Sequence, residues 1–155
     1  MNDKYKGCEE LKKGEILTEY RQIKPVLQDA RTIAVLGVSP KPGRDSYRVA
    51  RYLKDEGYRI LPVRPAQTEI LGEKVYRSLD DIDVPVDVVD AFRSGEQIMA
   101  HVVEVIRLRP KVFWMQLGIE NPEAAKMLTD AGIDVVMNRC IKMDHEDLFK
   151  KKIVV

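Results

Sequence analysis

The stretch TIAVLGVSPKPGRDSYRV, residues 32–49, decides the fold. It opens with a short, largely apolar run that stops at Gly37, a pattern typical of a strand buried on both faces of a parallel sheet. A loop follows, and a helix is expected to begin near Asp45 or Ser46. The stretch therefore predicts a strand, a loop and a helix in succession, which is the repeating unit of α/β proteins.

The same unit recurs along the chain. Helix-like segments separate four further apolar runs, at residues 59–63, 86–92, 112–117 and 133–137. Helix ends are also marked, by the capping-box pair Ser94 and Gln97, by Asn121 before a proline, and by the C-terminal glycines Gly57 and Gly132. The prediction is an α/β fold, a single Rossmann-like, doubly wound domain with a mostly parallel sheet of five or more strands.

Both ends of the chain are expected to lie outside this domain, which we place at residues 31–148. Residues 1–30 are predicted as an N-terminal helical extension, because apolar residues recur every three or four positions from Cys8 onward, with a break expected near Pro25. Residues 149–155 are predicted as a solvated C-terminal tail or a small packing arm.

The composition excludes several classes of protein. With 155 residues, 45% hydrophobic residues and a net charge of +1, the chain is expected to form one soluble globular domain, not a disordered one. Without a strong overall charge, binding to nucleic acid or to a membrane surface is not expected. Only two cysteines, Cys8 and Cys140, are present, which predicts neither a disulfide framework nor a metal site. We expect a cytoplasmic protein.

The first loop is the leading candidate for a binding site, because ligands of open α/β sheets bind beyond the carboxyl ends of the strands. Gly37 permits close approach to the backbone, Ser39 supplies a hydroxyl, and Lys41 and Arg44 supply positive charge before a helix N-terminus. These features suit a phosphate group. In the alternative interpretation, Gly37 and the neighbouring prolines only shape a tight turn. The loop matches neither a P-loop nor the dinucleotide fingerprint, whose second glycine is replaced by Ser39.

Residues after the later strands add to this candidate site. Arg64 stands where an NAD-binding protein has an acidic residue, and it suits a phosphorylated ribose, as in NADP or coenzyme A. Phe92 and Arg93 offer an aromatic surface and a cation for a nucleotide, while Gln116 and the following loop offer an amide and a close backbone approach. The alternatives are an exposed loop cation at Arg64, a core residue at Phe92 and a surface ion pair at Arg93.

Five motifs together resemble the small stand-alone CoA-binding proteins, relatives of the CoA-binding Rossmann domain in the succinyl-CoA synthetase alpha subunit. The motifs are IAVLGVSP (33–40), VRP (63–65), FRS (92–94), WMQLG (114–118) and VVMNRCIK (135–142). They occur in order within residues 31–148. One departure concerns Arg64, because many family members have asparagine at this position.

The resemblance implies a cleft that holds coenzyme A at the carboxyl ends of the strands. It implies phosphates near the first loop, the adenosine end near the second and third strands, and the pantetheine arm near the fourth. The candidate binding residues are Gly37, Val38, Ser39, Pro40, Lys41, Arg44, Val63, Arg64, Pro65, Phe92, Arg93, Gln116, Gly118, Asn138 and Cys140.

The leading functional prediction is a CoA or acyl-CoA binding protein that is non-catalytic on its own. Its expected protein partner is either a second copy of the chain, in a homo-oligomer, or another protein. One alternative is an NADP-dependent oxidoreductase. The other is a thiol-dependent CoA enzyme in which Cys140 is paired with His145. The more conservative expectation for His145 is a solvated position within a charged cluster, and His101 is expected to be a partly buried structural residue.

Overall fold

The computed structural model describes residues 12–151, and the expectations for residues 1–11 and 152–155 lie outside the described residues. Its centre is a five-stranded sheet in which every pairing is parallel, in the order β2-β1-β5-β6-β7. The strands are β1 (Thr32–Leu36), β2 (Arg59–Val63), β5 (Val88–Ala91), β6 (Val112–Met115) and β7 (Asp134–Val136). The predicted α/β class and parallel sheet are confirmed, and the strand order reverses between β1 and β5.

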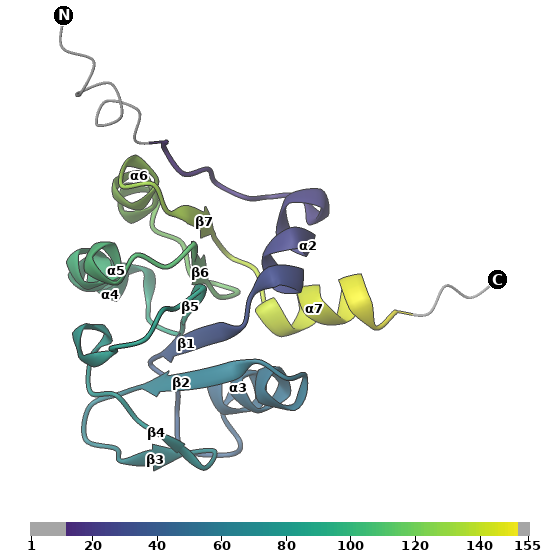
Figure 1. The fold of residues 1–155 in the computed structure, drawn as a ribbon, viewed down its shortest axis with the longest axis vertical. Helices are drawn as coiled ribbons and strands as arrows, with labels where there is room; N and C mark the ends of the chain where they lie inside the picture. The colour runs from purple at the N-terminus through teal and green to yellow at the C-terminus, as the bar shows by residue number, and fades with distance from the viewer. Residues whose placement is uncertain (1–11, 152–155) are drawn as a thin grey trace, which may run out of the picture.

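Helices cover both faces of the sheet (Figure 1). One face carries α2 (Tyr20–Asp29), α3 (Asp45–Asp55) and α7 (Ile141–Phe149). The other carries η2 (Leu79–Asp81), α4 (Gly95–Ile98), η3 (Met99–His101), α5 (Val102–Leu108) and α6 (Pro122–Asp130). Beyond β2, a small hairpin is formed by β3 (Glu69–Ile70) and β4 (Glu73–Lys74). No helix within residues 12–151 is both long enough and apolar enough to cross a membrane.

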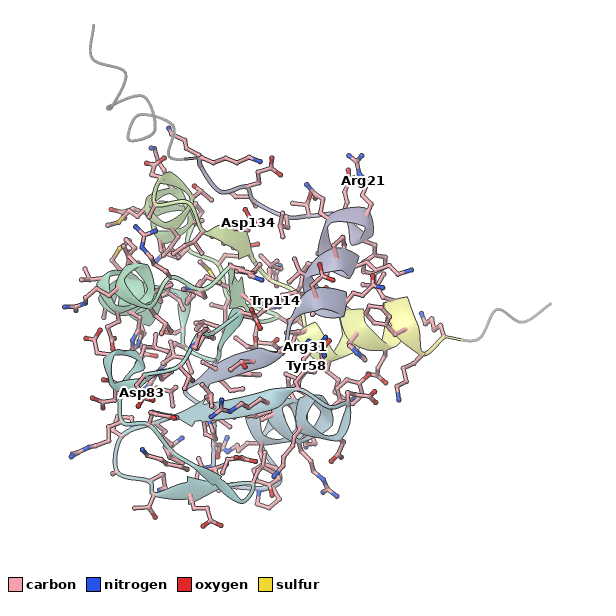
Figure 2. All side chains as sticks on the ribbon, in the orientation of Figure 1. Arg21, Arg31, Tyr58, Asp83, Trp114 and Asp134 are labelled. Carbon is pink, nitrogen blue, oxygen red and sulfur yellow. The ribbon has the colours of Figure 1, made fainter. Side chains whose placement is uncertain are left out.

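The sheet separates two hydrophobic cores. Phe113 and Trp114 are neighbours on β6, both fully buried, and their side chains pack on opposite faces. Trp114 lies among residues of α2 and α7 (Figure 2), and its Nε1 donates a hydrogen bond of 2.7 Å to the carbonyl oxygen of Arg139. This bond fixes the segment that leads from β7 into α7, next to the carboxyl edge of the sheet.

The predicted helix ends are confirmed. Ser94 and Gln97 form the capping box at α4, and the Asn121 side chain accepts a hydrogen bond from the backbone of Ala124 at the start of α6. Gly57 and Gly132 both have positive φ, at 99° and 90°, directly after α3 and α6. Ser94 and Asn121 thus begin helices in loops at the carboxyl edge of the sheet, whereas Gly57 and Gly132 lead into β2 and β7 at its amino edge.

The N-terminal segment differs from the expected helix. Within the described residues, α2 begins only at Tyr20, and it continues through Pro25 without a break. Residues 12–19 are not helical, and Ile16 forms a parallel bridge with Val135 of β7. The reason is that β7 is an edge strand, whose backbone groups offer hydrogen bonds to an extended segment.

The last described helix, α7, ends at Phe149, one residue into the predicted tail. The segment from Asp144 to Phe149 belongs to α7. The expectation of a solvated position for His145 is wrong, because His145 is only 7% exposed. Its ring packs edge-on against Tyr52 and Tyr58, and Nδ1 lies 2.7 Å from the Tyr52 hydroxyl. The neighbouring acidic residues concealed this burial in the sequence. His101, as predicted, is partly buried and pairs with Glu104.

The burial of His145 leads to a prediction on acid stability. Burial lowers its pKa from the usual value of 6.5, so the unfolded chain binds a proton at a higher pH than the folded protein does. Above pH 6.5 the neutral His145 contributes fully to the free energy of unfolding. This contribution is lost as the pH falls from 6.5 through the lower pKa of His145 in the folded protein. We expect His145→Phe to reduce the loss of unfolding free energy between pH 7 and pH 5, measured by urea unfolding. His101→Gln is the control, and an equal acid dependence in wild type and His145→Phe would contradict the prediction.

Candidate functional site

The loops after β1, β2 and β5 meet at the carboxyl edge of the sheet. The backbone N–H of Gly37 donates to the carbonyl oxygen of Val63 at 2.9 Å, which joins the first loop to the end of β2. The Arg64 guanidinium then reaches across and donates through Nη1 to the carbonyl oxygen of Val38 at 3.2 Å. Arg64 is therefore held against the first loop, and the sequence correctly placed these loops together.

Gly37 is the point of closest approach in this corner. Its φ is +80°, and a Cβ atom at this position would lie 2.7 Å from the carbonyl oxygen of Phe92 and 3.2 Å from Nε of Arg93. Only glycine fits here without strain, because a side chain disfavours this backbone conformation and because a Cβ atom would be too close to these two atoms. The side chain of Arg93 thus lies directly against Gly37.

Two guanidinium groups approach the same loop with unused hydrogen-bond donors. Nε of Arg93 is buried and has no hydrogen-bond partner within residues 12–151. Arg64 has five N–H donors, of which the described contacts use one. We call the group Gly37, Val38, Arg64 and Arg93 the arginine corner. Guanidinium groups bind phosphate through paired hydrogen bonds, so this corner suits a phosphate group.

The remainder of the first loop is largely bonded to itself. The Ser39 N–H donates to the Ser46 hydroxyl at 2.9 Å, and the Lys41 N–H donates to the Ser39 hydroxyl at 3.1 Å. The Arg44 N–H donates to the carbonyl oxygen of Lys41 at 3.0 Å. These N–H groups are already used, so an anion would depend mainly on side chains, including the exposed cations of Lys41 and Arg44.

Several of the predicted residues can contribute only through the main chain or at the rim. Val38 and Val63 are 0% and 1% exposed, because their side chains belong to the two cores. Pro40 is partly buried within the loop, and Pro65 is exposed beyond β2. Phe92 is half-buried, which leaves part of its ring accessible at the edge of the sheet.

A second part of the site is a groove between α3 and α7, with a volume of about 370 Å³. We call it the α3–α7 groove, and it is lined by Asp45, Arg48, Val49, Phe92, Gln116, Leu117, Ile119, Cys140, Lys142 and Met143. Gln116 is 4% exposed, and its Oε1 accepts a hydrogen bond of 2.9 Å from the backbone N–H of Ile141. Gln116 therefore caps the start of α7 as well as lining the groove.

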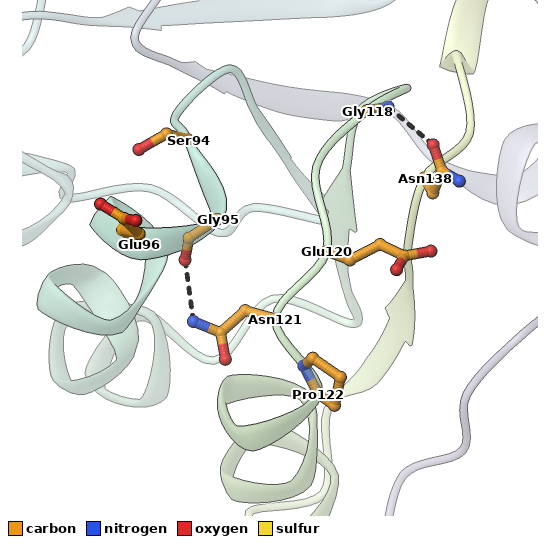
Figure 3. A pocket seen from close by; sticks show the side chains of 8 residues that line it. All are labelled: Ser94, Gly95, Glu96, Gly118, Glu120, Asn121, Pro122 and Asn138. Atoms are coloured by element: carbon orange, nitrogen blue, oxygen red, sulfur yellow. Dashed lines mark hydrogen bonds between the residues drawn. The ribbon is translucent and has the colours of Figure 1, made fainter.

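Gly118 and Asn138 lie in a different hollow (Figure 3). Asn138 accepts a hydrogen bond of 2.7 Å from the Gly118 N–H, which ties the loops after β6 and β7 together. This hollow, of about 750 Å³, is lined by Ser94, Gly95, Glu96, Gly118, Glu120, Asn121, Pro122 and Asn138. Its two glutamates make it a poor place for phosphate. The predicted residues are thus divided between the arginine corner, the groove and this hollow.

Sequence reasoning missed Asp90. This residue lies on β5, is 0% exposed, and neither carboxyl oxygen has a hydrogen-bond partner in the described part of the chain. It pairs in register with Val35 and Trp114, and it shares a face with Phe92 two residues further on. Burial raises the pKa of Asp90 well above its usual value. The signal in the sequence was an acidic residue within a strand buried on both faces.

Comparison with known proteins identifies the family of this chain. The profile of the family described as a CoA binding domain matches residues 31–146. The chain belongs to the CoA-binding domain family. This membership confirms the resemblance carried by the five sequence motifs.

Relatives span a range of sizes. The chain is 43% identical over 124 residues to the uncharacterized protein YneT of Bacillus subtilis, covering 80% of this chain and 92% of the relative. It is 38% identical over 63 residues to the ADP-forming acetate–CoA ligase of Methanocaldococcus jannaschii, covering 38% of this chain and 9% of the ligase. It is similar in structure to cell-free ID.343 from Thermus thermophilus, with a TM-score of 0.82 and 44% identity, covering 85% of this chain and 100% of that one.

For a CoA-binding domain, the main requirement is a place for phosphate groups. At the arginine corner, Nε of Arg93 lies against Gly37 and has no hydrogen-bond partner in the described residues. Within residues 12–151, no three His, Cys, Asp or Glu residues are grouped so as to hold a metal ion.

Proposed function

We propose that this CoA-binding domain binds coenzyme A across the carboxyl edge of its sheet, with phosphate groups of the cofactor at the arginine corner. The observation that carries the proposal is the approach of two guanidinium groups to the first loop. Arg64 donates to the Val38 carbonyl oxygen, and Arg93, whose Nε has no partner in the described residues, lies against Gly37. Each guanidinium group has further N–H donors, and an anion at this corner would accept hydrogen bonds from them.

The remaining groups of the edge suit the other parts of the ligand. The accessible part of the Phe92 ring offers a stacking surface for adenine, while Lys41 and Arg44 add positive charge at the entrance. The α3–α7 groove continues from the first turn of α3, and Gln116 there offers an amide to the pantetheine arm. We propose that the domain holds CoA or acyl-CoA without performing chemistry on it.

The two catalytic alternatives receive less support. NADP would also use Arg64, but the family profile and the relatives favour coenzyme A. A thiol enzyme would need a base beside Cys140. His145 is the candidate base, but its ring is held in the aromatic cluster with Tyr52 and Tyr58, where Nδ1 contacts the Tyr52 hydroxyl. It is not free to take a proton from Cys140 in this arrangement.

The test is ligand-dependent thermal unfolding with CoA, dephospho-CoA, NADP and NAD. A ligand that binds the folded state raises the unfolding temperature by mass action. We expect CoA to stabilise the protein, and dephospho-CoA to bind about 10-fold more weakly or worse, since one hydrogen bond to a charged group contributes roughly 1.5–3 kcal/mol. Stabilisation by NADP without stabilisation by CoA would overturn the proposal.

Variants locate the phosphate contact. Arg64→Gln is expected to remove most of the difference between CoA and dephospho-CoA, because the guanidinium at the first loop is lost. Arg31→Gln is the matched control, since Arg31 is exposed and directly precedes β1 at the opposite edge of the sheet. A full preference for CoA in Arg64→Gln would move the recognised phosphate away from this arginine.

A further inference from the structure

The α3–α7 groove is lined by more apolar than polar side chains. Its walls include Val49, Phe92 and Ile119, and its rim carries Leu117 and Met143. The two rim residues are 61% and 55% exposed, although they come from separate elements, the loop after β6 and helix α7. Large apolar side chains that are exposed together around one groove are typical of a surface that binds an apolar ligand.

The charged residues of the groove are paired with other protein groups. Arg48 forms a salt bridge with Asp45 and donates through Nη1 to the carbonyl oxygen of Gly43 at 2.9 Å. Lys142 pairs with Glu146 at 3.2 Å. Each cation therefore has a carboxylate beside it, so the groove offers little to a carboxylate-bearing group and suits an uncharged one.

Gln116 supplies one directional polar contact. Its Oε1 is held by the Ile141 N–H, which fixes the plane of the side-chain amide at the floor of the groove. An amide whose oxygen is occupied recognises ligands through its NH2 group, and so through a carbonyl or another acceptor. The groove thus combines apolar walls, paired charges and a hydrogen-bond donor.

We propose that the α3–α7 groove binds the uncharged acyl chain of an acyl-CoA thioester, with the Gln116 NH2 group donating to a carbonyl of the ligand. This inference rests on the proposed binding of CoA at the arginine corner. The groove volume of about 370 Å³ lies near the lower end of the range for small-molecule sites, roughly 300–1,000 Å³. It accommodates part of the arm with a short acyl chain but not the whole cofactor.

The proposal predicts a ladder of affinities. CoA, acetyl-CoA, butyryl-CoA and hexanoyl-CoA are titrated into the protein by calorimetry. Each methylene that enters the groove tightens binding up to about 4-fold, because burial of one methylene contributes roughly 0.8 kcal/mol. The gain is expected to level off once the groove is full. Succinyl-CoA, which has as many acyl carbons as butyryl-CoA but ends in a carboxylate, is expected to lose this gain.

A pair of variants assigns the effect to the groove. Leu117→Asp places a charge at the exposed rim and is expected to remove most of the gain of hexanoyl-CoA over CoA, measured as the ratio of the two affinities in each variant. Val103→Asp is the matched control, because Val103 is 58% exposed on α5, on the opposite face of the sheet. It is expected to keep the full ladder.

The outcomes separate the inference from the proposed function. If neither CoA nor any acyl-CoA binds, the proposed function is wrong. If CoA binds but all acyl-CoA compounds bind equally well, the function stands and the acyl groove is overturned. A ladder that persists unchanged in Leu117→Asp would likewise overturn the assignment to this groove.

Discussion

Replacing Gly37 with valine is expected to abolish CoA binding and to lower the free energy of unfolding by about 3 kcal/mol. A non-glycine residue held at a φ of +80° costs roughly 1–3 kcal/mol, and β-branched side chains lie at the upper end. The new Cβ would also lie 2.7 Å from the Phe92 carbonyl oxygen, so the loops after β1 and β5 must separate. Their separation would displace Arg93 from the arginine corner.

The same loop provides the control for this experiment. A Cβ at Gly43 would have no neighbouring atom within 4 Å, and Gly43 does not have positive φ, so Gly43→Val is expected to leave stability nearly unchanged. Gly37→Ala carries the same Cβ with a smaller side chain and allows binding to be measured on a folded protein. Urea unfolding and calorimetric titration with CoA give the two readouts. An unchanged urea midpoint for Gly37→Val would show that the corner tolerates a Cβ.

Replacing Asp90 with leucine is expected to stabilise the protein by about 1–3 kcal/mol at pH 7. Leucine branches at the same carbon as aspartate, although it is larger, and the substitution removes a buried carboxyl group whose two oxygens have no hydrogen-bond partner in the described residues. An unsatisfied buried polar group costs roughly this amount. Few substitutions of a charged residue in a strand increase the free energy of unfolding.

The size of the stabilisation by Asp90→Leu depends on pH in a defined way. Below the usual aspartate pKa of 3.8, the carboxyl group is neutral in both the folded and the unfolded chain. As the pH rises, the unfolded chain ionises while the raised pKa keeps folded Asp90 neutral, so wild-type stability falls. The advantage of Asp90→Leu is therefore expected to grow from pH 4 towards pH 7 in urea unfolding experiments.

Asp87, only three residues away, gives the opposite expectation. Its carboxylate accepts hydrogen bonds from the backbone of Arg31 and Thr32, at 2.8 and 3.0 Å. Although partial burial opposes ionisation, these bonds and Lys111 hold the pKa of Asp87 below its usual value. Asp87→Leu is therefore expected to destabilise the protein at pH 7. If Asp90→Leu destabilises the protein as much as Asp87→Leu does, the Asp90 carboxyl group is stabilised by its surroundings and the prediction is wrong.

The strands and helix ends were predictable because their signals are local. An apolar run ending at Gly37 and the capping box at Ser94 act within a few residues, so the sequence shows them directly. The burial of His145 and the extended course of residues 12–19 depend on distant partners, Tyr52 and β7. No local pattern contains that information.

The candidate site was predictable only in part, for a similar reason. A parallel sheet brings the ends of its strands to one edge, so the meeting of Gly37 with Arg64 and Arg93 could be anticipated. The path of each loop after its strand could not. Gly118 and Asn138 are consequently joined to each other in a separate hollow, away from Gln116. The lack of a partner for Asp90 likewise depends on what packs around it.

The short bridges at the two sides of the sheet limit how copies of the chain can associate. Along β7, the Leu17 N–H donates to the Val135 carbonyl oxygen at 2.8 Å, and along β2, the Tyr76 N–H donates to the Pro62 carbonyl oxygen at 2.9 Å. The chain thus occupies backbone positions on both outer strands that a neighbouring molecule would need for edge-to-edge β-augmentation. Self-association of this protein is therefore expected to proceed through its helical layers, and its sheet is protected from growing into a fibril.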